Sequence, residues 1–547
     1  MFISPDHIPL RDSDLNLDIS GVAGFFGGDV AVSAMSTVHI YKGRKWLGWY
    51  NSPGSYEIAK RYGRLAARSR FFGGLYPGSP VDPAVLFELD GTAGPRYRGV
   101  RSGTVMSKTG HLAHLLLQEC KHRPEEAWAV PAGARETTPA TVTVAHLHHR
   151  SRKVFHPHNE RFSSYVAVIP IFASVTTAVM CALTQDWLCF YMIVLGMLCS
   201  GVSCWLIAQG VFTFTRPKSA VGSPPGDGIL ESGGQMVILL GREDAVNPIT
   251  RGQFSLEYKS APKHINIGIS SLLLTVQFLV QLLVVPQGEI FGQIMFLCSL
   301  AVSWIYNSYL SSLDKESIQR RILVNQVLKK PRMLKYKLGT RTTVVVFVLL
   351  VLSESKDMDA VTLEDVLHDL LPNDTRTWRL WKSTVIEAIS QMAHSGERSP
   401  EPFPASLTEQ ASELNDSDRK LLESLFTDAR TAYAAFLAYM RYVPLVRYHA
   451  VMTDRSSGRA TQSPFLLTIS RTTKVRRSPT LPAQPGRRQR WRTWSLEVAL
   501  NIVAVLPCAA LRIPCGLDAV PHSLMNLNLR KTRRKTRMKP GMLWIVN

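Results

Sequence analysis

Two long stretches of the chain, residues 162–215 and 264–314, contain no lysine or arginine. Both are mostly apolar, and each has one acid near its middle, Asp186 or Glu289. A membrane-spanning helix needs about 20 apolar residues, so each stretch has room for two spans joined by a turn at the acid. The pattern therefore predicts a polytopic α-helical membrane protein with two transmembrane hairpins and four spans.

Outside these stretches the apolar runs are short. Residues 236–240 and 344–352 are too short to span a membrane and are typical of buried strands, and we expect them to pair in a small mixed α/β domain. Residues 84–89 and 141–147 are further candidate strands. The periodicity of apolar residues predicts helices at residues 112–119, 362–371, 374–392 and 417–442.

The resulting organisation has six parts. They are an N-terminal region (1–161), the first hairpin (162–215), a polar link (216–263), the second hairpin (264–314), an α/β region (315–452) and a basic, disordered tail (453–547).

Net charge singles out the tail. The whole chain carries +21, and residues 447–547 supply 19 of its basic residues against three acids. A basic segment next to a membrane attracts anionic lipid, and we expect residues 530–539 to do so. The run has no aromatic residues for base stacking, so nucleic acid is not an expected partner.

Two further interpretations of the tail stay open. Residues 496–511 are apolar enough to be a short fifth span, which would place the C-terminus on the opposite side of the membrane. Alternatively, the sharp change in composition after Met452 is typical of translated intron, and residues 453–547 would then be an artefact of gene modelling.

The distribution of basic residues predicts the orientation. Four basic residues precede the first span, six lie in the link and nine follow the last span between Lys315 and Arg341, whereas the two turns carry none. Basic residues near spans stay in the cytoplasm. Both termini and the link are therefore expected to be cytoplasmic.

The second hairpin contains the candidate site residues, which are Gln277, Gln281, Gln293 and Asn307. Polar side chains of this kind hold transmembrane helices together through interhelical hydrogen bonds, within one chain or in a homo-oligomer. The alternative is a polar lining for a solute path. No charged residue lies in the middle of a span, and such residues are typical of ion-coupled transport.

No motif predicts an enzyme, a cofactor or a metal site. His146, His148, His149, His156 and His158 precede the first span, but their spacing matches no known metal site, and we expect a solvated basic segment. Residues 241–247 (GREDAVN) follow a strand but lack the Gly-Lys-Ser/Thr of a phosphate loop, which predicts an ordinary turn. The eight cysteines show no disulfide or zinc spacing.

Three segments around the second hairpin carry a family resemblance. They are MVILLGREDAVNPITRGQFSL at 236–256, GQIMFLCSLAVSWIYNSYLSSLDKESIQRRIL at 292–323, and KYKLGTRTTVVVFVLLVL at 335–352. The chain resembles, over about residues 1–445, a family of uncharacterised multi-pass membrane proteins of mushroom-forming fungi. The resemblance implies a fungal membrane protein and brings no catalytic residue with it.

These observations favour a non-enzymatic membrane scaffold or sensor whose cytoplasmic part carries the interactions. The alternative is a small-solute channel or transporter that acts as an oligomer.

Overall fold

The computed structural model describes residues 26–442, except 27, 42, 80, 127–133, 138–139, 149–164, 260–263, 355–357, 396–401 and 405–413. All described residues belong to one compact unit, Met1–Gln484. The predictions for residues 453–547, including the fifth span and the contact with anionic lipid, fall outside the described residues.

The two stretches that lack lysine and arginine form four apolar helices: α8 (Val168–Leu183), α9 (Trp187–Ile207), α11 (Ile265–Val284) and α12 (Ile290–Ser311). Three of them are long and apolar enough to cross a membrane: α9, α12, and α11 with its continuation η5 (Val285–Gln287). By length and composition, these three are candidate membrane spans among the described residues. Helix α8 has 16 residues, or about 24 Å at 1.5 Å per residue.

The acids mark the ends of helices, as the sequence predicts. The Asp186 carboxylate accepts a hydrogen bond of 3.0 Å from the Cys189 backbone N–H and caps the start of α9. Helix α12 begins directly after Glu289. Beyond these turns the helices pack differently: α8 packs on α9 and α12, whereas α11 packs on α9 and α3.

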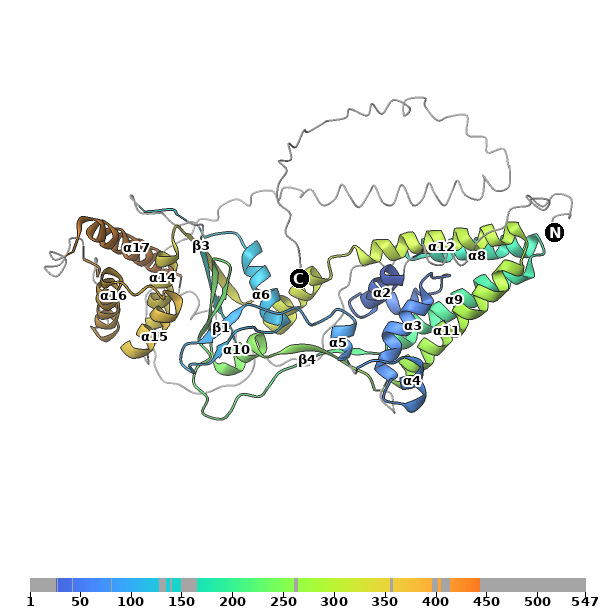
Figure 1. Cartoon of the computed structure of the whole chain (residues 1–547), viewed down its shortest axis with the longest axis horizontal. Helices are drawn as coiled ribbons and strands as arrows, with labels where there is room; N and C mark the ends of the chain where they lie inside the picture. The colour runs from blue at the N-terminus through green and yellow to red at the C-terminus, as the bar shows by residue number, and fades with distance from the viewer. Residues whose placement is uncertain are drawn as a thin grey trace, which may run out of the picture. The chain divides into compact units, whose positions relative to one another are not determined.

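N-terminal helices fill the space between α11 and α12 (Figure 1). Helix α2 (Gly28–Ser36) packs on α12, and helix α3 (Ser55–Gly63) packs on α11. Short elements follow them along the chain: η2 (Thr37–His39), η3 (Arg44–Trp46), η4 (Arg64–Ala66), α4 (Arg70–Leu75) and α5 (Pro83–Leu86). The prediction of a strand at residues 84–89 is wrong, because Asp82 and Pro83 start a helical turn there.

A six-stranded sheet with the order β2-β1-β5-β6-β3-β8 joins distant parts of the chain. Only the β3–β6 pair is parallel. Strands β4 and β7 form a separate antiparallel pair. The strands are β1 (Arg96–Gly99), β2 (Val105–Met106), β3 (Ala140–His146), β4 (Val211–Thr215), β5 (Gly228–Ser232), β6 (Gln235–Leu240), β7 (Gln253–Glu257) and β8 (Arg332–Leu338).

The predicted strands at 141–147 and 236–240 are confirmed as β3 and β6, which pair directly. Alternation sends their side chains to opposite faces of the sheet. Val237 and Leu239 pack toward α6 (His111–His122), α10 (Glu243–Thr250) and α13 (Lys315–Ile322), whereas Met236 and Ile238 pack toward α14–α17. A π-helical turn, η6 (Leu323–Val327), extends α13.

Two predictions about backbone conformation fail here. Residues 344–352 form helix α14 (Arg341–Ser353) rather than a strand, because Thr340 caps its first turn and its side chains are covered on every side. Residues 241–247 are more than a turn, since α10 begins at Glu243. The predicted helices are confirmed as α6, α15 (Ala360–Leu370), α16 (Arg376–Ser395) and α17 (Asp416–Met440).

A buried acid ties α17 to the start of α14. The Asp428 side chain is 1% exposed, accepts a hydrogen bond of 2.9 Å from the Thr340 hydroxyl and pairs with Arg135 at 2.7 Å. The ion pair and the hydrogen bond satisfy a carboxylate that would be costly to bury alone.

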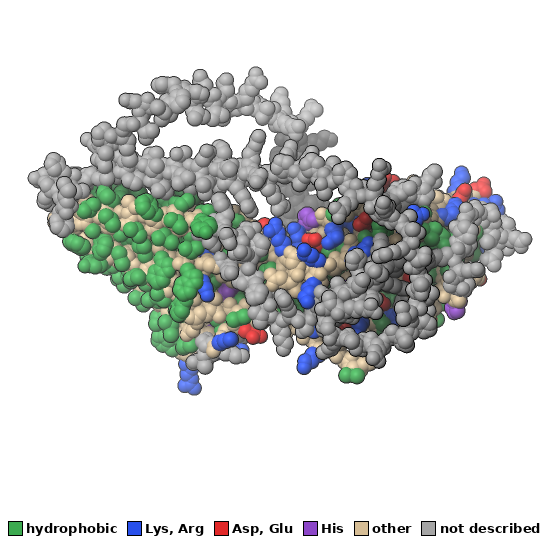
Figure 2. All heavy atoms as spheres, turned by 180° about the vertical axis from the view of Figure 1, so that it is seen from behind, with side chains coloured by type: hydrophobic (Ala, Val, Ile, Leu, Met, Phe, Trp, Pro, Cys, Tyr) green, Lys and Arg blue, Asp and Glu red, His purple; other side chains and the backbone are tan. Residues whose placement is uncertain are grey.

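The apolar helices leave one face uncovered, and Figure 2 shows it as a broad hydrophobic surface. The exposed side chains recur at helical spacing: Val168, Phe172, Val175 and Val179 on α8, Leu188, Tyr191 and Leu198 on α9, and Ile269, Val276, Leu279 and Leu283 on α11. Monomeric soluble proteins rarely expose an apolar patch of this kind, so the face fits a lipid environment.

Candidate functional site

The candidate residues on α11 form a short hydrogen-bonded chain. The Gln277 side-chain amide donates to the Gln281 side-chain oxygen at 3.2 Å. The Gln281 amide in turn donates to the Met192 carbonyl oxygen on α9 at 2.9 Å and to the Asn51 side-chain oxygen at 3.4 Å. Gln281 thus links α11 to α9 and to a loop from the N-terminal region.

Asn307 on α12 contacts the same loop. Its side-chain oxygen accepts a hydrogen bond from the Tyr50 hydroxyl at 2.9 Å, and its amide donates to the Ser52 hydroxyl at 3.1 Å. Gln293 lies apart from the other three residues. Its amide donates to the Gly288 carbonyl at 2.8 Å within the turn that precedes α12.

Asn51 is the point where the four apolar helices meet. Its backbone N–H donates to the Ser174 hydroxyl of α8 at 3.1 Å, and its side-chain amide donates to the Ser299 hydroxyl of α12 at 2.8 Å. Its side-chain oxygen accepts from Gln281 of α11. Asn51 is 0% exposed. One residue, through its backbone N–H and its side chain together, therefore bonds to polar groups of three helices in an otherwise apolar bundle.

The fourth helix, α9, accommodates the loop through two glycines. A Cβ at Gly196 would overlap the Asn51 side-chain oxygen, and a Cβ at Gly201 would overlap the Trp49 ring. Ser299 and Gly196 each lie near the middle of their helix. Irregular backbone is tolerated at this depth among apolar helices where protein covers it, and residues 47–53 are covered in this way.

Arg44 lies beside the same loop and is 2% exposed. Its guanidinium donates to the Tyr50 hydroxyl at 2.9 Å and to the Leu47 carbonyl at 3.0 Å, and it lies over the rings of Tyr50 and Tyr306 at 5.8 and 5.5 Å. Within the described residues no acid pairs with it. Aromatic faces and a carbonyl therefore replace a carboxylate as its partners.

No sequence pattern singled out Arg44, Tyr50 and Asn51 as site residues. They belong to the run KWLGWYNSPG at 45–54 and its flank, where three aromatic residues surround a glycine and precede a polar turn. That mixture of aromatic residues with a short polar turn was the available signal. It has no 20-residue apolar length and no helical period, so a search for spans passes over it.

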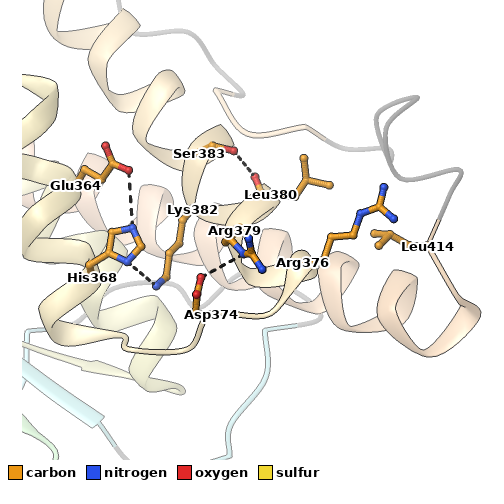
Figure 3. A pocket seen from close by; sticks show the side chains of 9 residues that line it. All are labelled: Glu364, His368, Asp374, Arg376, Arg379, Leu380, Lys382, Ser383 and Leu414. Carbon is orange, nitrogen blue, oxygen red and sulfur yellow. Dashed lines mark hydrogen bonds and ion pairs between the residues drawn. The ribbon is translucent and has the colours of Figure 1, made fainter.

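A second candidate site is a cavity of about 600 Å³ between α15 and α16 (Figure 3). Lys382 lines it and is 3% exposed. The Lys382 ammonium donates to the Leu371 carbonyl at 2.7 Å and to His368 Nδ1 at 3.2 Å. Burial lowers the pKa of Lys382 below its usual value, and Asp374 opposes the shift.

The rest of the cavity lining is charged. Arg379 pairs with Asp374 at 3.3 Å, and His368 lies 3.7 Å from Glu364. Arg376 lies one turn before Arg379 on α16 and lines the same cavity. Three cationic side chains thus stand against two carboxylates.

The histidine segment before α8 does not form a common site where it is described. His146 lies at the end of β3, and burial lowers its pKa to about 4, with smaller effects from His148 and Arg332. His149, His156 and His158 lie outside the described residues. Among the described residues, no group of three or more His, Cys, Asp or Glu side chains is arranged to hold a metal ion.

Comparison with known proteins gives no relative: no protein-family model, curated protein or solved structure matches the chain.

Proposed function

We propose that the chain is a four-span membrane protein in which α8–α9 and α11–α12 are the two hairpins. Strands β1 and β3 precede α8, strands β5 and β6 lie between the hairpins, and strand β8 follows α12, yet all five belong to one sheet. An open sheet cannot form across the hydrocarbon core, so each helix pair must return the chain to the same side. If α9 crosses, α8 crosses as well.

The sheet is proposed to lie on the cytoplasmic side of the membrane. Basic residues flank the spans on that side and are missing from both turns. A fungal origin of the chain is part of this proposal, because the sequence resembles a family of fungal membrane proteins.

We further propose that the protein is a non-enzymatic membrane scaffold or sensor. This proposal rests on one observation: residues 50–52 of the chain itself occupy the centre of the bundle of apolar helices. Gln281, Asn307 and Ser299 bond to residues 50–52, which fill the position that a solute would need. The helices would then anchor the sheet and α14–α17, which carry the interactions.

The second candidate is a small-solute channel or transporter that acts as an oligomer. One observation favours it: Gln277 Oε1, Ser270 Oγ and Ser303 Oγ are buried and have no hydrogen-bond partner among the described residues. Buried polar atoms of this kind are commonly satisfied by water, and bound water among the helices would favour a path for a small solute.

Flux measurements on the purified full chain in liposomes separate the two. A scaffold gives no solute or ion flux above that of empty liposomes. A channel gives flux that is lost in the Gln277→Leu/Gln281→Leu double variant and kept in the Gln287→Leu control, whose side chain is exposed and bonds only to the Leu283 carbonyl. Flux with that pattern, at unchanged oligomeric state, would refute the scaffold.

A further inference from the structure

The cavity between α15 and α16 is lined by a buried cation, Lys382, whose hydrogen-bond partners are not carboxylates. Lys382 has three N–H donors and two hydrogen-bond partners, the Leu371 carbonyl and the His368 imidazole. Among the described residues no carboxylate forms an ion pair with it. Burying an ammonium in such surroundings is costly, and the cost falls when an anion binds in the cavity that Lys382 lines.

Two arginines bring further donors to the cavity from one face of α16. Arg376, Arg379 and Ser383 recur at intervals of three and four residues, which places them on the same side of the helix. The Arg379–Asp374 pair is 67% exposed on both sides, and such surface pairs contribute at most about 1 kcal/mol. An incoming anion therefore competes with Asp374 at little expense.

His368 lies between Lys382 and Glu364 in the cavity lining. The Lys382 Nζ lies 3.2 Å from His368 Nδ1, and the other ring nitrogen, Nε2, lies 3.7 Å from Glu364. Figure 3 shows Lys382 pointing between His368 and Asp374, with Arg379 on the side of Asp374. The lysine donor therefore stays directed inward instead of toward solvent.

We propose that this cavity binds the phosphate group of a small phosphate ester. A phosphate presents three acceptor oxygens and close to two negative charges, which matches the Lys382 ammonium and the Arg379 guanidinium better than a single carboxylate does. Arg376 lines the other end of the cavity, beside Leu414, and adds positive charge there (Figure 3). The cavity volume, about 600 Å³, falls in the range of ligand pockets. Leu380 and Leu414 also line the cavity and leave room for an apolar part of the ester.

The phosphate has two sources, a soluble metabolite or a phospholipid headgroup, and one experiment distinguishes them. The full chain is purified in maltoside micelles, which contain no phosphate, and binding is measured by calorimetry. The probes are inorganic phosphate, glycerol 3-phosphate and, separately, micelles doped with phosphatidic acid. Saturable binding of glycerol 3-phosphate supports the soluble source, and saturable binding of phosphatidic acid alone supports the lipid source.

Three variants locate the site. Arg376→Gln/Arg379→Gln alters only exposed side chains, and Lys382→Met removes the buried charge while keeping an unbranched apolar chain. Each is expected to weaken binding about tenfold or more, since a charged hydrogen bond is lost. Lys420→Gln on α17 is the control, because Lys420 is exposed and does not line the cavity, and it should leave the affinity unchanged.

Unfolding curves recorded on the same samples show that each variant is folded, and the arginine variant keeps the test valid if Lys382→Met does not fold. Unchanged affinity in the folded arginine variant overturns the proposal. The proposal is also overturned if none of the three probes binds saturably at concentrations up to about 100 times the micromolar level at which metabolite sites commonly saturate. Equal binding of acetate and phosphate also contradicts it, because the site would then lack phosphate selectivity.

Discussion

Helices α14 and α11 are both mostly apolar, yet their surroundings differ. The side chains of residues 342–352 on α14 are all buried, between the sheet and α15–α17. Helix α11 leaves Ile269, Val276, Leu279 and Leu283 about half exposed or more. An apolar run therefore indicates only that water is excluded. Whether protein or lipid excludes it depends on what the rest of the chain supplies.

Length is the first difference between these helices. Helix α14 has 13 residues, about 20 Å at 1.5 Å per residue, which is too short for a hydrocarbon core of about 30 Å. Helix α11 and η5 together have 23 residues. The second difference is the supply of apolar partners, since α17 presents Leu425, Ala429, Ala432 and Phe436 to the α14 core.

A matched pair of alanine substitutions, one on each helix, gives the largest expected difference in stability. Phe347 on α14 is 0% exposed and contacts the rings of Tyr336 and Tyr439, so Phe347→Ala should cost about 3–5 kcal/mol of unfolding free energy. Leu279 on α11 is 50% exposed, and Leu279→Ala should cost less than about 1 kcal/mol in micelles. Denaturant unfolding of the purified chain measures both. Equal costs would mean that protein, not lipid, covers Leu279.

One added methyl group tests whether residues 47–53 pack closely against α9 inside the bundle. Gly196→Ala places a Cβ against the Asn51 side chain, and the forced shift should cost about 1–3 kcal/mol. Gly74→Ala on α4 is the control, because nothing lies within 4 Å of a Cβ there, and it should be neutral or slightly stabilising. Hydrogen exchange at residues 47–53 should quicken in the first variant and stay unchanged in the second.

Stability of the sheet region should depend on pH through His146. Its pKa falls to about 4 in the folded protein, chiefly by burial, against about 6.5 in an unfolded chain. Between these values the unfolded chain binds the proton more readily, so stability falls as the pH drops from about 6.5 toward 4. The polar groups near the ring are His148, Arg332 and the Tyr439 hydroxyl, and the two basic groups oppose its protonation further. Unfolding of His146→Gln across this range should show a weaker decline; an identical decline would assign it to other groups.

The apolar spans, the turn acids and the long periodic helices could be predicted from the sequence, because each depends on a local pattern. The wrong strand at 344–352 has a clear cause: nine apolar residues show no period, and the β-branched valines favoured a strand. Only the pairing of β3, β6 and β8, which no local pattern encodes, creates the surface that α14 covers.

Only part of the candidate site could be predicted from the sequence. Gln277, Gln281 and Asn307 are recognisable because amides are conspicuous in an apolar stretch. Asn51 lies more than 200 residues before Gln281 along the chain, and its position depends on a tertiary contact with Gly196 of α9. Arg44 likewise lies over the Tyr306 ring only in the folded chain. The cavity around Lys382 likewise forms only when α15 and α16 pack.

The central claim is that both hairpins cross the membrane and return, and accessibility of single cysteines tests it most directly. In a background without the other cysteines, Gln185→Cys and Gln287→Cys in the two turns and Ser232→Cys at the end of β5 place exposed thiols on opposite sides of the proposed membrane. An impermeant maleimide applied to intact cells should label the first two and leave Ser232→Cys unlabelled until the membrane is opened. Labelling of Ser232→Cys on intact cells would contradict the two-hairpin account.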